Sequence, residues 1–143
     1  MYCRDGIFLI QEILDKVISE PRNSIKRRIR NKQEYRKYVQ VEFNGHLVKM
    51  DSLRYQLFKE KGTICVECGL KATHFALESM KGDMIGNNNP PYHFNLYGVR
   101  NGREVLFTKD HIHPASKGGK NNLNNMQTMC TECNLKKADK VKK

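Results

Sequence analysis

Apolar residues near the start of the chain recur at the spacing of an amphipathic helix. In the segment 7–19 the residues that share one helical face are Leu9, Ile10, Ile13, Leu14 and Val17. Proline lacks the amide hydrogen that a helix interior needs, so Pro21 predicts the end of this helix. The next segment, 23–38, is rich in Lys and Arg and predicts a basic helix or arm.

Alternation with a period of two then replaces the helical spacing. Valine and phenylalanine alternate with polar residues across 38–50, around Asn44-Gly45, a dipeptide that readily adopts the positive φ angles of a tight hairpin turn. This pattern predicts a β-hairpin. A short helix over 53–61 is expected next, with Asp51 or Ser52 as its N-cap and a glycine at its end.

The C-terminal half predicts two more strands, a glycine turn and a final helix. The segment 92–114 has the strand pattern around Asn101-Gly102, a second hairpin signal. Gly118-Gly119 permits a sharp turn after these strands, and 132–143 has the composition of a helix. The segment 71–84 follows no clear period, so its structure stays open.

Length and charge limit the class of protein. A chain of 143 residues is expected to form one domain, as a monomer or a homodimer. It carries 26 Lys and Arg against 15 Asp and Glu, which gives a formal net charge of +11 and a pI of about 9.6. Such a balance favours a polyanionic partner, a nucleic acid above all. No apolar stretch approaches the roughly 20 residues that span a bilayer, so no membrane partner is expected. No secretory signal is recognised either, so the expected location is cytoplasmic.

The basic segment near the N-terminus has two interpretations. Its cationic residues either contact phosphates or form an ordinary solvated face; those assigned to nucleic-acid binding are Lys26, Arg27, Arg28 and Arg30.

Four of the five cysteines form two CxxC pairs: Cys65 with Cys68, and Cys130 with Cys133. In a reducing compartment such thiols are interpreted as metal ligands rather than disulfides, and two CxxC turns supply the four ligands of a tetrahedral zinc ion. A site with four protein ligands leaves no position for a substrate, so the predicted Zn²⁺ is structural. Cys3 is left as an unbound thiol.

The segment DHIHPASKGGKNNLNNMQTMCTECNLKK, residues 110–137, closely resembles the HNH endonucleases. The shared features are the DH pair, the Gly-Gly loop, a mid-loop asparagine, and CxxCN with a trailing lysine. The resemblance covers 65–140 and implies an α+β fold, a small ββα-metal (His-Me finger) nuclease core with a structural zinc knuckle. Residues 1–60 are expected to form a basic N-terminal extension made of helices and a hairpin, and 61–143 the zinc-stapled HNH nuclease domain.

The resemblance also implies roles for individual residues. Asp110 corresponds to the family's metal-binding acid and His111 to the general base that activates water. Asn125 corresponds to the asparagine that pins the loop and so orients the histidine. Asn134 corresponds to the second metal ligand, and Lys137 to a basic position that can contact phosphate.

One further histidine stays ambiguous. His113 lies two residues beyond His111 on the same face of a strand, so it either joins the metal or phosphate or is a spacer, as in many relatives. Asp110 and His111 themselves point to opposite faces of an ideal strand. If both serve one phosphate, a distorted strand end is expected.

The chemistry of phosphodiester hydrolysis requires these groups. Imidazole titrates near pH 6.5, so a neutral histidine can accept the proton of the attacking water. A divalent cation held by one carboxylate and one amide oxygen keeps open positions for the phosphate and the leaving oxygen. Hard oxygen ligands suit Mg²⁺ or Mn²⁺.

The predicted function is therefore a metal-dependent HNH endonuclease that nicks or cuts DNA. Family habit favours a phage or mobile-element type, which would place the enzyme in a host cytoplasm. A non-catalytic, zinc-dependent nucleic-acid-binding module is the main alternative, and it is disfavoured because all four residues at the motif positions are present. A structure-specific nuclease and a packaging-associated nuclease are the others.

Overall fold

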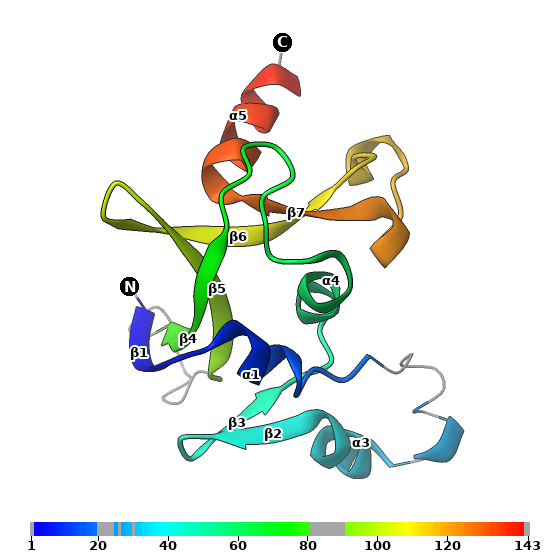
Figure 1. Cartoon of the computed structure of the whole chain (residues 1–143). Helices are drawn as coiled ribbons and strands as arrows, with labels where there is room; N and C mark the ends of the chain where they lie inside the picture. The colour runs from blue at the N-terminus through cyan, green and yellow to red at the C-terminus, as the bar shows by residue number, and fades with distance from the viewer. Residues whose placement is uncertain (1, 20–24, 26, 30, 81–90, 142–143) are drawn as a thin grey trace.

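The computed structural model describes residues 2–19, 25, 27–29, 31–80 and 91–141, and its main element is a five-stranded antiparallel sheet (Figure 1). The strands follow the order β1-β4-β5-β6-β7. Their bounds are β1 (Tyr2–Phe8), β4 (Ala72–Met80), β5 (His93–Arg100), β6 (Arg103–His111) and β7 (Met126–Cys130). The fold is thus a small mixed α/β domain with more sheet than helix.

The remaining elements flank this sheet. A separate hairpin joins β2 (Gln40–Phe43) to β3 (His46–Lys49). The helices are α1 (Ile10–Leu14), α3 (Lys32–Val39), α4 (Leu53–Lys61) and α5 (Thr131–Val141), with 3₁₀ turns at Ala115–Lys117 and Leu123–Asn125. In Figure 1, α5 lies on one side of β6 and β7, and α4 lies on the other.

The elements that the sequence predicts best are those set by turn and capping residues. Both hairpins form at the expected dipeptides: φ is 50° at Asn44 and 53° at Asn101, and the glycine after each is also positive. Ser52 caps α4 by accepting a hydrogen bond from the Tyr55 amide. These predictions are confirmed.

The predicted helix over 7–19 is wrong at both ends, because only its middle part is helical. Tyr2–Phe8 form β1, which pairs antiparallel with β4 from Tyr2 opposite Met80 to Phe8 opposite Phe75. Only Ile10–Leu14 are α-helical, and Leu9 of the predicted buried face is 73% exposed. Pairing with a strand about 70 residues away in sequence overrides the local helical period. The segment with no clear period, 71–84, supplies that partner strand.

Ion pairs hold β1 in the sheet. Arg4 donates to Glu78 on β4 (2.9 Å) and to both carboxylate oxygens of Glu104 on β6. Glu78 is buried and also accepts from Asn95 and the Tyr97 hydroxyl, so its charge is fully hydrogen-bonded. The first strand of the chain therefore belongs to the same sheet as the C-terminal strands. The described part of residues 1–60 contains the expected hairpin and helices and, in addition, this strand, which the expected extension did not include.

The hydrophobic core lies between the sheet and the N-terminal elements. Phe43 of the hairpin meets Phe94 of β5 edge to face at 4.8 Å, and Phe8 meets the same ring at 5.4 Å. Ile13, on α1, and Phe58, on α4, are fully buried in this cluster. The N-terminal segments therefore form one side of the hydrophobic core and pack against β5 and β6.

Candidate nuclease and metal sites

The four predicted zinc ligands come together although 62 residues separate Cys68 from Cys130. Their sulfur atoms all lie within 4.8 Å of one another, and the Sγ atoms of these two residues are 3.9 Å apart. Sulfurs about 2.3 Å from a tetrahedral zinc ion are separated by about 3.8 Å. The cluster therefore has the donor set and the spacing that could hold a zinc ion. Cys3 lies outside it.

Short-range hydrogen bonds shape the first CxxC turn. The Gly69 amide donates to the Cys65 carbonyl, and the Cys65 amide donates to the Leu70 carbonyl. Gly69 has φ near 80°, a conformation that glycine adopts without steric cost. The Val66 amide donates to Thr128 on β7, which joins this turn to the strand that carries the second cysteine pair.

Electrostatics differ among the four thiols. The backbone of Leu70 hydrogen-bonds Cys68 and lowers the pKa of its thiol to about 6, and the Arg100 guanidinium, 2.9 Å from Sγ, acts in the same direction. Burial raises the pKa of Cys133, and the neighbouring Cys130 thiol adds to this effect. A bound cation is what would favour the thiolate form of all four.

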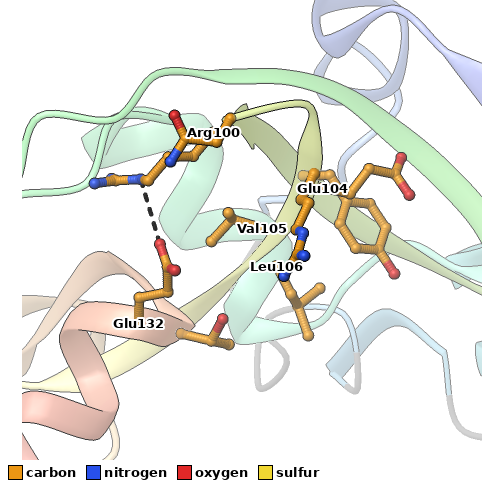
Figure 2. Close-up of a pocket in the computed structure, with 9 residues that line it drawn as sticks. Arg100, Glu104, Val105, Leu106 and Glu132 are labelled. Carbon is orange, nitrogen blue, oxygen red and sulfur yellow. Dashed lines mark ion pairs between the residues drawn. The ribbon is translucent and has the colours of Figure 1, made fainter.

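Arg100 also ties the cluster to α5. Figure 2 shows its side chain extending from the end of β5 toward Glu132, with 3.3 Å between Arg100 Nε and Glu132 Oε1. Because Arg100 contacts both Cys68 and Glu132, it joins the first CxxC turn to the first turn of the helix.

Asp110, near the end of β6, has a cationic partner. The residue is 9% exposed, and its Oδ2 accepts hydrogen bonds from Lys137 Nζ at 2.6 Å and from Gln127 Nε2 at 2.9 Å. The same Lys137 amine donates to the His111 carbonyl at 2.9 Å. A positive charge from α5 is therefore already present beside the predicted metal-binding acid.

His111 lies on the opposite face of β6 from Asp110. The strand pairs with β7 without a register shift through Asp110 opposite Gln127 and His111 opposite Met126, so the pairing shows no distortion up to His111. Nε2 of the ring is 2.6 Å from Oδ1 of Asn121. Because an amide oxygen only accepts, Nε2 of the neutral imidazole carries the proton and Nδ1 keeps its lone pair.

Asn125 connects the two ends of the loop between β6 and β7. Its side-chain oxygen accepts from the His113 amide at 2.8 Å, and its side-chain nitrogen donates to the carbonyls of His113 and Lys120. Its own amide donates to Oδ1 of Asn122. The side chain of Asn125 therefore holds together the two ends of the loop that follows His111.

The Gly-Gly pair lets this loop fold back on itself. Gly118 has φ of 88°, as the sequence predicts. Gly119 approaches the backbone so closely that a Cβ at this position would overlap the carbonyl oxygen of His113. The His113 ring hydrogen-bonds the Lys117 carbonyl at 2.8 Å, which places it within this loop.

The remaining predicted site residues lie on α5 and in the N-terminal segment. Asn134 is half-buried and lies three residues before Lys137, hence on the same helix face. Arg27 and Arg28 are exposed, with the Arg28 guanidinium 5.7 Å from the centre of the Tyr38 ring. Lys26 and Arg30 lie outside the described residues.

Sequence reasoning missed two neighbours of the site, Asn121 and Gln127. Asn121 belongs to a run of four asparagines within five residues, 121–125, and the pattern alone does not distinguish which one meets the histidine. Gln127 has no motif signal at all. Only strand register, which sets Gln127 opposite Asp110, could have identified it.

Comparison with known proteins agrees with the motif. Residues 100–143 match the model of a family described as HNH endonuclease, and this segment contains both residues of the DH pair and the second CxxC. The resemblance seen in the sequence is thereby confirmed for residues 100–143. No match was found among curated proteins or solved structures. Within the described residues, each helix is too short or too polar to cross a membrane.

Proposed function

We propose that the protein is a metal-dependent endonuclease that hydrolyses phosphodiester bonds of DNA. The observation that carries the proposal is the HNH match over residues 100–143. This segment includes the end of β6, where Asp110 contacts the Lys137 ammonium and His111 hydrogen-bonds Asn121. The net charge of +11 suits a polyanionic substrate.

His111 acts as the general base in this proposal. Asn121 holds the ring through Nε2, so Nδ1 is the atom that takes the proton of the attacking water. Asn125 closes the loop that carries Asn121 and so supports this orientation indirectly. The proton moves from water to Nδ1, and the resulting imidazolium is stabilised by the Asn121 oxygen.

Asp110 and Asn134 would hold the divalent ion, Mg²⁺ or Mn²⁺. The donor chemistry fits: a buried carboxylate whose partners are a Lys ammonium and a Gln amide is already arranged to face positive charge. When bound, such an ion neutralises charge on the phosphate and on the leaving oxygen. The Lys137 ammonium lies beside the Asp110 carboxylate and can contact phosphate from there.

One observation favours the non-catalytic alternative. The Lys137 ammonium lies 2.6 Å from the Asp110 carboxylate and so could replace a divalent ion, which would leave a zinc-dependent DNA-binding module. Calorimetric titration with Mn²⁺ separates the two: an endonuclease binds the ion at a site that Asp110→Asn removes, and a binding module does not.

The test of activity is nicking of supercoiled plasmid by purified protein with Mg²⁺ or Mn²⁺, against an EDTA control. We expect cleavage by wild type and none by His111→Ala. A wild type that never cuts with any divalent metal would leave the binding-module alternative. Parallel assays with linear duplex and branched junctions distinguish a general nuclease of phage or mobile-element type from a structure-specific or packaging-associated one.

A further inference from the structure

Strands β5 and β6 separate from one another toward the predicted catalytic end of the sheet. Their pairing runs from Arg100 opposite Arg103 only as far as Tyr97 opposite Leu106. Beyond that point β5 continues to His93 beside β4, whereas β6 continues to His111 beside β7. Figure 1 shows the two strands running in different directions, with α4 near the space between them.

A cleft of about 420 Å³ opens where the strands diverge. We call it the β5–β6 cleft. One side is formed by residues 91–93, the others by Lys109 of β6, the start of α4 and one face of the β2–β3 hairpin. Its full lining is Gln40, Leu47, Lys49, Ser52, Leu53, Arg54, Tyr55, Pro91, Tyr92, His93 and Lys109.

The charges in this lining are all of one sign. It contains Lys49, Arg54 and Lys109 and no Asp or Glu. Glu42 of the hairpin shares a face with Lys49 but does not line the cleft. Asp51, directly before Ser52, is buried and accepts a hydrogen bond from the Tyr35 hydroxyl. A concave surface with three cations and no carboxylate raises the local concentration of phosphate groups.

Neutral hydrogen-bond acceptors hold the Arg54 side chain in place. Its guanidinium donates to the Phe94 carbonyl and, at 3.2 Å, to Oδ1 of Asn95, and it lies 5.5 Å from the centre of the Tyr55 ring. Both acceptors are neutral, so neither cancels the cation. An arginine that is already ordered loses little conformational entropy when it binds phosphate.

One residue of the lining, Lys109, lies close to His111 on β6. Lys109 and His111 are two residues apart on β6 and therefore project from the same face, about 6.6 Å apart along the strand. At the other end of α4, Lys61 donates to the carbonyl of Met126, the residue paired with His111. Cations thus extend from the hairpin, past Lys109, to the neighbourhood of the proposed general base.

We propose that the β5–β6 cleft binds the phosphates of a DNA strand and leads that strand to His111. This inference rests on the proposed function, because it names where the substrate of that site enters. It assigns a role to the N-terminal half, which lies outside the HNH match: the hairpin and α4 form the substrate channel.

The test compares two double variants of equal charge. Lys49→Gln with Lys109→Gln removes two cations from the cleft. Lys71→Gln with Arg103→Gln removes two from exposed positions outside it. Zinc content and melting temperature are measured first, to show that both variants fold as wild type does. Affinity for a labelled duplex is then measured against NaCl concentration, in buffer without added divalent metal so that no cleavage occurs.

We expect the slope of log affinity against log salt to fall by about 1–2 in the cleft variant, since each phosphate contact contributes roughly 0.9. The slope of the control variant should stay at the wild-type value. An unchanged slope in the cleft variant, or an equal decrease in both, would overturn the proposal. Plasmid nicking by wild type is scored separately: if nicking depends on His111 but the slope does not change, the cleft assignment alone fails. If the slope changes as expected but wild type never cuts, the nuclease assignment alone fails.

Discussion

The cysteine cluster and the Asp110–His111 site both involve residues of β7 and α5. They differ in burial, in the kinds of side chain and in how those side chains are arranged. Three of the four cysteines are buried. All four candidate ligand atoms are thiol sulfurs, and they lie within 4.8 Å of one another. Asp110 and His111 leave opposite faces of one strand, and their partners are of mixed kind: a lysine, a glutamine and an asparagine. Four thiols can fill every position of a tetrahedral metal ion, as a structural metal requires, whereas one carboxylate and one amide oxygen would leave positions open on a bound ion.

This difference supports our proposal that the cluster stabilises the fold and that the Asp110–His111 site carries the chemistry. Cys130 ends β7 and Cys133 lies in the first turn of α5, so a metal at the cluster would fix how the helix starts. Asn134 and Lys137 follow on that helix, and Lys137 reaches Asp110. A disturbed cluster should therefore disturb the second site as well, whereas the reverse should not hold.

The largest effect is expected from loss of the cluster. We expect about one tightly bound zinc ion per chain, and Cys68→Ser should unfold the C-terminal half, because binding by a structural zinc site contributes about 10–16 kcal/mol to folding. Metal analysis and circular dichroism measure this. Cys3→Ser is the matched control and should change nothing. A folded protein without zinc would contradict the assignment.

His111→Ala should separate the two sites. Losing a general base costs about 10²–10⁴-fold in rate, so plasmid nicking should fall by that factor. DNA affinity and zinc content should stay at wild-type values, because neither depends on the imidazole. His113→Ala, a histidine of the same loop, is the comparison and should have a smaller effect. Equal nicking by His111→Ala and wild type would exclude this residue as the base.

Asn121 should act through His111. Asn121→Ala removes the acceptor at Nε2 and should lower the nicking rate about 10–100-fold, as other partners that orient a functional histidine do. Asn121→Asp keeps an acceptor and adds a carboxylate that stabilises the imidazolium. The rate should then be partly restored, and the acidic limb of the pH–rate profile should move to higher pH. A purely structural asparagine would not move that limb.

The smallest effect concerns the loop. Gly119→Ala places a methyl group against the carbonyl of His113, so we expect a loss of about 1–3 kcal/mol in unfolding free energy together with slower nicking. Lys117→Ala, in the same loop, keeps the backbone contacts and should have wild-type stability in thermal unfolding. Equal stability of the two variants would show that the loop relaxes around the added methyl.

Elements that depend on a few neighbouring residues were predictable from the sequence. Asn44-Gly45 and Asn101-Gly102 form the expected turns because their positive φ angles are a local property of these dipeptides. The two CxxC pairs could be matched across the chain because thiol chemistry is specific. The division of the chain at residue 60 and the catalytic roles of Asp110, His111, Asn125 and Asn134 stay predictions.

The sequence by itself thus determined the hairpins, helix α4, the four cysteines that cluster and the resemblance to HNH endonucleases. The tertiary structure alone decided that 2–8 is a strand, that it pairs with β4, and that Asn121 rather than a neighbouring asparagine meets His111. It also decided that β5 and β6 diverge and leave a basic cleft between them. The physical reason is that turns and caps are set by dihedral preferences within a few residues. Strand pairing and loop contacts instead depend on which groups, distant in sequence, are available as hydrogen-bond partners. A local pattern does not contain that information.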